Sequence, residues 1–367
     1  MRVKKIVGFL KKCLPVYALV LYFFSFLSLI FYVLSRSSNA VADAFDATVG
    51  YALRRATAFV SDLVPVSLAE LIIIVSPLIV AGIVFLAVRA LRRGRGIRFL
   101  SGFLSVFFAF LSLYSLTLGI GYHKTEIEKN LDLPGREVNA ESLAETFLQL
   151  MEECNALAEE LTLDADGFSV MPMDFRTLSD EINVAFDRLC ADIPSLEIKN
   201  FHSDAKRVML SRQMSALEIT GVYTFFTGEA NVNVHYPDYS VPYTLAHELA
   251  HQRGIARENE ANFIAHLVCI RSDNPYIRYS GYMNMLEYVA SAISRTDKEL
   301  YRELYAGLNA NIVSEMKAYS DFYRNNKKPF WSKLSDTVND TYLKAQGTEG
   351  IVSYGLVVRL AVAYYAE

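Results

Sequence analysis

Three long runs without a charged residue dominate the first third of the chain and constrain its fold more than any other feature. They cover residues 14–35, 71–88 and 99–122. A helix of about 20 apolar residues crosses the ~30 Å hydrocarbon core of a bilayer. The sequence therefore predicts three transmembrane helices in a membrane region of residues 1–122. The first run could also be a signal peptide, but it exceeds the usual signal core and two further spans follow it, which favours a retained anchor.

Basic residues flank these runs unevenly and predict how the chain crosses the membrane. Five Lys or Arg residues precede the first run and five lie in residues 89–98, whereas residues 36–70 hold three Arg residues and four acidic ones. Because Lys and Arg accumulate in short cytoplasmic loops, we expect the N-terminus and residues 89–98 to be cytoplasmic. Three spans then place everything after about His123 outside. The expected location is the cytoplasmic membrane, with a multi-pass chain and an extracytoplasmic domain.

Net charge and cysteine content exclude two other classes of protein. The formal net charge is −4 and the pI is about 5.9, so no overall basic field indicates nucleic acid as a partner. Three of the four cysteines follow the spans at wide spacing, which is not a disulfide framework. We expect buried thiols, with Cys154–Cys190 as one alternative pairing.

Residues 140–367 have the pattern of a mainly helical α+β domain, joined to the membrane region by a polar linker over residues 123–139. Apolar residues recur at spacings of three and four through most of this part, including residues 331–345. Residues 219–236 are instead rich in β-branched and aromatic residues, which predicts a small hairpin or sheet. The apolar C-terminal segment is short and contains Arg359, so we expect a packed helix there. A further helix, between the first two spans, is expected along the outer membrane surface.

The sequence HELAH at residues 247–251 has the spacing of a zinc site on a helix. His247 and His251 are four residues apart, which places both imidazoles on one helix face. They could share one Zn²⁺, while Glu248 would act as the general base toward a metal-bound water. Pro242 and Gly254 are suited to the first turn and the end of this helix.

A third protein ligand is expected from the segment RENEANF at residues 257–263. Glu258 is preferred, with Asn262 one turn later and able to hydrogen-bond a ligand imidazole. Glu260 is the alternative, although it heads an apolar stripe that points to the interior. Arg257 occupies the position at which some zinc sites have a third histidine, so that version of the site is excluded.

Several other residues are weaker candidates for the same site. An oxyanion could be stabilised by a tyrosine or histidine, for which Tyr223, Tyr279, Tyr282 and His266 are eligible. Glu229 and Asn231, in the expected strand, could contact substrate or the metal surroundings, although a role in the turn is equally consistent.

Two sets of motifs resemble known families. HELAHQ with the downstream box of Glu258 to Asn262 resembles the glutamate-closed zincins, in which the first glutamate of that box is a ligand. TGEANVN, HELAHQRGIARENEANFIA, YSGY, NDTYLKAQG and SYGLVV together resemble a family of bacterial membrane proteins catalogued as the domain of unknown function 3810. The resemblance implies membrane helices followed by a zincin-like metallopeptidase domain, with no substrate assigned.

Two functions of different classes follow from these features. The first is a membrane-anchored zinc metallopeptidase that hydrolyses peptide bonds of a peptide or protein substrate outside the cytoplasm. Its motif lies over a hundred residues beyond the last span, unlike that of an intramembrane protease. The alternative is a non-catalytic zinc-binding sensor or scaffold that binds an envelope peptide or partner. A purely structural membrane protein would bind no zinc.

Overall fold

Three helices of the computed structural model are long and apolar enough to cross a membrane: α2 (Val16–Ser37), α5 (Leu68–Arg92) and α6 (Gly96–Thr117). The structure describes residues 13–165, 167–326 and 353–366, and four isolated positions between 328 and 341. The number of spans agrees with the sequence prediction. The helix expected over residues 331–345 lies outside the described residues except at three of those positions.

The ends of the third span differ from the prediction. The uncharged run continues to Tyr122, but α6 ends at Thr117 and residues Gly119–His123 form a 3₁₀ turn. Ile120 and Tyr122 in that turn are buried by protein. Hydropathy alone does not distinguish a side chain facing lipid from one facing a protein interior, which explains why the sequence overextends this span.

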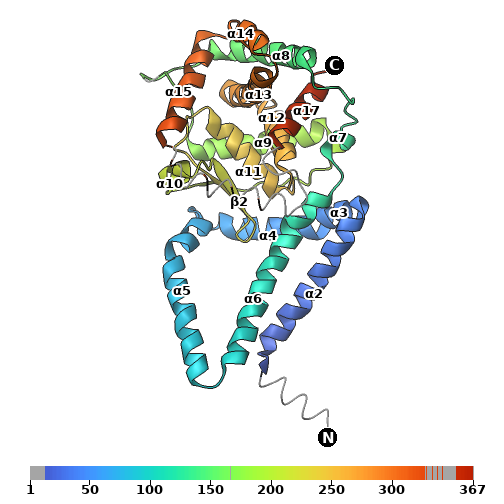
Figure 1. Cartoon of the computed structure of the whole chain (residues 1–367), viewed down its shortest axis with the longest axis vertical. Helices are drawn as coiled ribbons and strands as arrows, with labels where there is room; N and C mark the ends of the chain where they lie inside the picture. The colour runs from blue at the N-terminus through green and yellow to red at the C-terminus, as the bar shows by residue number, and fades with distance from the viewer. Residues whose placement is uncertain are drawn as a thin grey trace.

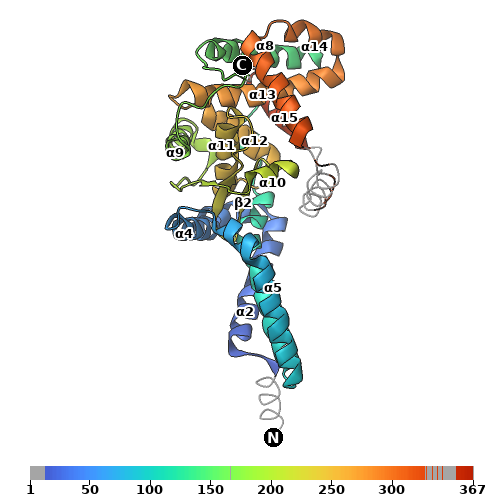
Figure 2. The ribbon, with the colours of Figure 1, turned by 90° about the vertical axis from the view of Figure 1, so that its left-hand side faces the viewer.

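Short helices lie across the ends of the candidate membrane helices that are nearer the rest of the chain. These are α3 (Asn39–Phe45), a π-helical turn (Asp46–Gly50) and α4 (Tyr51–Asp62). They separate the membrane helices from the rest of the chain, which stands directly above them in two perpendicular views (Figure 1 and Figure 2). The helix expected between the first two spans is therefore present as this short series.

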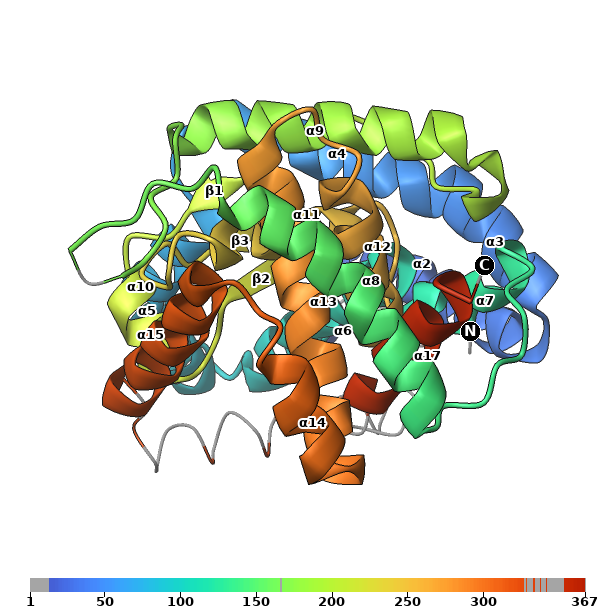
Figure 3. The ribbon, with the colours of Figure 1, turned by 90° about the horizontal axis from the view of Figure 1, so that it is seen from above.

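The remaining chain is mainly helical, as expected. Its helices are α7 (Ile127–Asn130), α8 (Ala140–Ala158), α9 (Phe175–Asp192), α10 (Ser211–Ala216), α11 (Ser240–Gln252), α12 (Glu258–Cys269), α13 (Pro275–Thr296), α14 (Lys298–Tyr305), α15 (Ala310–Asn326) and α17 (Ser353–Tyr364). α8 packs on α13, and α13 packs on α11 and α12, so α8 lies on the side away from the membrane helices (Figure 3). The C-terminal α17 contributes Val357, Leu360 and Val362 to the same core.

A small sheet packs against α11 on the side nearer the membrane helices. Its strands are β1 (Lys206–Arg207), β2 (Gly221–Thr224) and β3 (Glu229–Val232), in the order β1-β3-β2. β2 and β3 are antiparallel and form the predicted hairpin, whose turn requires a positive φ of 74° at Gly228. Because β2 is an outer strand of the three-stranded sheet, only one of its edges pairs with another strand.

Part of the linker over residues 123–139 packs against the domain and is not extended through solvent. Ile127 in α7 is buried and belongs to the main hydrophobic core. The cysteines are all free thiols, so the alternative bridge between Cys154 and Cys190 does not form. Cys154 and Cys269 are buried, as the sequence led us to expect.

Candidate metal centre

α11 presents His247 and His251 on one face, one turn apart. Their Nε2 atoms are 3.0 Å apart and their ring planes are at 89° to each other. The Nδ1 of His251 lies 2.7 Å from the carbonyl oxygen of Ile255. A proton donated from Nδ1 to that oxygen leaves the Nε2 lone pair of His251 directed at His247 and available to a metal ion.

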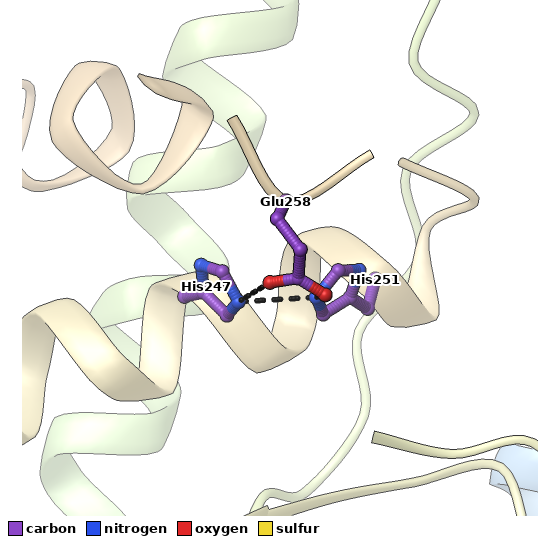
Figure 4. A group of neighbouring side chains, drawn as sticks. All are labelled: His247, His251 and Glu258. Atoms are coloured by element: carbon purple, nitrogen blue, oxygen red, sulfur yellow. Dashed lines mark hydrogen bonds and ion pairs between the residues drawn. The ribbon is translucent and has the colours of Figure 1, made fainter. Parts of the chain in front are cut away.

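Glu258 reaches the two histidines from the first turn of α12. Gly254 follows the end of α11 with a φ of 94°, a conformation that reverses the chain and that favours glycine. Oε2 of Glu258 lies 3.4 Å from Nε2 of His247, and Oε1 lies 3.5 Å from Nε2 of His251. Figure 4 shows the carboxylate pointing between the two imidazoles. These three side chains could hold one metal ion.

The group is accessible as well as compact. The side chains of His247 and Glu258 are 14% and 32% exposed. Solvent therefore reaches the side chains of His247 and Glu258, while His251 is buried.

Glu260, the alternative ligand, lies elsewhere. Its carboxylate accepts hydrogen bonds from Nη1 of Arg257 at 2.8 Å and from the backbone N–H of Ile127 at 3.1 Å. Arg257 in turn donates to the carbonyl oxygens of Tyr122 and Lys124. Glu260 thus fastens α12 to the chain that leaves α6, while Glu258 faces the histidines.

Glu248 is buried between α11 and β2. A Cβ atom placed on Gly221 would lie 2.5 Å from Oε1 of Glu248, so only glycine allows the strand to approach this closely. The backbone N–H of Tyr223 donates to the same carboxylate. The contact of Gly221 with Glu248 depends on tertiary packing, which no local sequence pattern encodes.

The side chains of His251, Glu258 and Glu248 shift one another's pKa. Burial alone would lower the pKa of His251, but Glu258 and Glu248 raise it to about 9. Burial alone would raise the pKa of Glu258, but His251 and His247 hold it well below its ordinary value. Burial raises the pKa of Glu248, against the opposing effect of the histidines. A metal ion binding here would displace the proton from His251.

Asn262 does not have the expected role among the described residues. Its carbonyl oxygen and Oδ1 accept from the Tyr243 hydroxyl at 2.8 and 3.4 Å, and it makes no hydrogen bond to a ligand histidine. The Ile255 carbonyl takes that role for His251 instead. The turn between the helices brings this backbone oxygen closer to the imidazole than the next turn of α12 can reach.

The oxyanion candidates separate into two groups. The Tyr279 hydroxyl donates to Glu315 at 2.6 Å, His266 bonds the Gly281 carbonyl and the Tyr365 hydroxyl, and the Tyr282 ring packs beside His266. Tyr223 alone of the four is tied to Glu248, through its backbone. Its hydroxyl is buried without a hydrogen-bond partner among the described residues.

Glu229 and Asn231 have structural partners. The two carboxylate oxygens of Glu229 accept from the backbone N–H groups of Leu68 and Ala69 at 2.8 and 2.9 Å, so Glu229 caps the N-terminus of α5. The Asn231 amide donates within the hairpin, to the Thr224 hydroxyl and the Val222 carbonyl.

Comparison with known proteins gives a family and no described relative. Neither a curated protein nor a solved structure matches the chain. A family model described as "Protein of unknown function (DUF3810)" matches residues 47–362. The match runs from the π-helical turn, through α5 and α6 and both helices of the candidate metal centre, into α17. The chain therefore belongs to this family of proteins of unknown function.

Proposed function

We propose that this protein is a membrane-anchored zinc metallopeptidase that hydrolyses peptide bonds on the outer side of the cytoplasmic membrane. One observation carries the proposal: His247, His251 and Glu258 converge on one point with Glu248 beside them. A water-activating metal and an adjacent general base are the parts that peptide-bond hydrolysis needs.

The donor set is consistent with zinc. Two imidazole nitrogens and one carboxylate oxygen form a set typical of catalytic zinc sites, whereas Ca²⁺ and Mg²⁺ prefer oxygen ligands. Zn–ligand bonds of 2.0–2.1 Å in a tetrahedron put the ligand atoms about 3.4 Å from one another. The two imidazole Nε2 atoms are 3.0 Å apart, and the two Glu258 oxygens lie 3.4 Å from that of His247 (Oε2) and 3.5 Å from that of His251 (Oε1). Three protein ligands leave the fourth position for water.

Glu248 is suited to proton transfer. When bound, zinc would lower the pKa of a coordinated water and polarise the carbonyl of a peptide. Glu248 would take the proton as that water attacks and deliver it to the leaving amine. The N–H of Tyr223 and the close approach of Gly221 hold the carboxylate in one position.

The test uses the full-length chain in lipid nanodiscs, with zinc content and cleavage of a peptide library measured together. We expect one zinc per chain, retained in Glu248→Gln with turnover lower by about 10²–10⁴-fold, and lost in His247→Ala. Glu303→Gln, an exposed carboxylate on α14, is the matched control. Full activity of Glu248→Gln would contradict the mechanism. Stoichiometric zinc without any cleavage would favour the sensor or scaffold instead.

A further inference from the structure

The turn that joins the two metal-site helices rests on the outer ends of the membrane helices. A Cβ atom on Gly254 would lie 2.5 Å from Nη2 of Arg54 in α4. A Cβ atom on Gly121, just beyond α6, would lie 2.9 Å from the Cβ of Ala256. Backbone and side chain are in direct contact at both points. The candidate metal centre is therefore held against the outer membrane surface with no spacer.

The tip of the β2–β3 hairpin reaches past that surface. The Phe225 ring lies 4.9 Å from the ring of Phe110 and 5.3 Å from that of Tyr114, and Phe226 lies 5.5 Å from Phe110. α6 has 22 residues, so its length of about 33 Å matches the hydrocarbon thickness. Phe110 is seven residues before the end of α6 at Thr117, about 10 Å along the helix. The two phenylalanines therefore lie at the depth of the lipid hydrocarbon.

The opposite end of the same hairpin, at the start of β2, contacts Glu248. Gly221 contacts the Glu248 carboxylate, and Phe225 lies four positions after Gly221, directly beyond the end of β2. At about 3.3 Å per residue this is about 13 Å. An extended peptide lying along β2 with its scissile bond at Glu248 would thus have its membrane-side end at the lipid.

The hairpin stands between α5 and α6, which diverge from their short connection toward the domain (Figure 1). Glu229 of β3 caps the start of α5, and Phe225 packs on α6. In α5 only Ala69 and Glu70 are buried, and most of the helix beyond them is exposed among the described residues. An apolar segment embedded in the same bilayer can approach the hairpin from the side through lipid.

We infer that the substrates are polypeptides anchored in the same membrane, cut within about ten residues of the outer end of their apolar segment. The inference rests on the proposed peptidase function. β2 has an edge unpaired by any strand of its sheet, and a strand edge binds extended polypeptide through backbone hydrogen bonds. Anchoring confines such a segment near the site and raises its effective concentration. A freely diffusing peptide has no such advantage.

The experiment compares two peptide libraries on the zinc-loaded full-length protein in liposomes. One library is a randomised stretch of about 20 residues following a transmembrane helix, reconstituted with the protein. The other has the same stretch without the helix. We expect the anchored library to be cut at least tenfold faster, with cut positions, read by mass spectrometry, concentrated within ten residues of the anchor.

Two further outcomes separate this inference from the function on which it rests. Equal cutting of both libraries, or cuts spread evenly along the anchored stretch, would overturn the inference and leave the peptidase function standing. Cleavage of neither library by zinc-loaded protein would count against the peptidase function itself and would remove the inference with it.

A variant of the hairpin tests the same inference by changing the protein instead of the substrate. Phe225→Ser with Phe226→Ser should reduce the tenfold preference for the anchored library and broaden its cut positions, with one zinc per chain as evidence that the fold is intact. Phe59→Ser, an exposed aromatic residue on α4 and outside the hairpin, is the control and should keep the preference. An unchanged preference in the zinc-loaded double variant would contradict the role given to the hairpin.

Discussion

Glu258 and Glu260 are two residues apart on α12, yet their carboxylates have different surroundings. Glu258 faces two imidazoles and is partly exposed, whereas Glu260 is buried against Arg257 and the backbone of Ile127. Burial raises the pKa of Glu260, and Arg257 only partly offsets this effect. The first residue is placed to hold a metal ion and the second to hold two segments of chain together.

This difference predicts opposite results for two alanine variants. Glu258→Ala should weaken zinc binding by at least about 100-fold, because a ligand is lost, while the fold is retained. Glu260→Ala should keep one zinc per chain but lower stability by about 3 kcal/mol, because Arg257 is left buried without its carboxylate. Competition with a chelator measures the first effect and thermal unfolding of the metal-free protein the second. If Glu260→Ala loses zinc and Glu258→Ala keeps it, Glu260 is the ligand.

Gly221 provides a second prediction at the scale of a residue. Gly221→Ala should reduce turnover by at least tenfold without changing zinc content, because its methyl group would displace the Glu248 carboxylate from beside the metal group. Gly135→Ala is the matched control, since a Cβ atom there meets nothing within 4 Å. A loss of zinc in Gly221→Ala would show instead that the strand supports the ligands themselves.

At the scale of elements, one buried arginine connects the membrane region to the metal-site turn. Arg54 in α4 donates to Asp46 at 2.5 Å and to the Thr117 carbonyl at the end of α6, and it contacts Gly254. Burial alone would raise the pKa of Asp46, but Arg54 and Lys124 hold it below its ordinary value. Removing one partner from such a pair leaves the other charge buried and uncompensated.

We therefore expect Arg54→Met to destabilise the protein by about 3–5 kcal/mol. The neighbouring Arg55, which is exposed, gives the matched control in Arg55→Met. Unfolding temperature in detergent is the measurement. Adding Asp46→Asn to Arg54→Met should recover part of the loss, since it removes a buried carboxylate that then has only Lys124 as its ion-pair partner. If Arg54→Met unfolds at the wild-type temperature, the ion pair between Arg54 and Asp46 does not stabilise the junction.

The sequence predicts the elements of this fold better than the contacts between them. The spacing of His247 and His251 is a local property of one helix, and three apolar runs are enough to predict three spans. The capping of α5 by Glu229 joins residues 160 positions apart, and the Ile255 carbonyl meets His251 only because of the turn at Gly254. Such contacts depend on tertiary packing, which no local periodicity encodes.

At the scale of the whole molecule, the membrane region and the metal-site domain form one connected structure. Lys206 of β1 donates to the Val64 carbonyl, and Glu70 of α5 accepts from the backbone N–H groups of Met209 and Leu210. Together with Glu229 and Arg54, these bonds join the domain to the ends of the candidate membrane helices that face it. The position of His247, His251 and Glu258 relative to the ends of the candidate membrane helices is therefore set by the fold.

Because this arrangement is fixed, the proposed function requires the domain to lie on the outer side of the membrane. Cysteine labelling can test this. Three spans put the N-terminus and the domain on opposite sides, and the five arginines of residues 89–98 favour a cytoplasmic position for the loop between α5 and α6. In a chain otherwise free of cysteine, Gly135→Cys should react with a membrane-impermeant maleimide in intact cells. Gly94→Cys should react only after the cells are permeabilised. The opposite labelling would place the metal group in the cytoplasm, where the same geometry could not act on substrates at the outer surface.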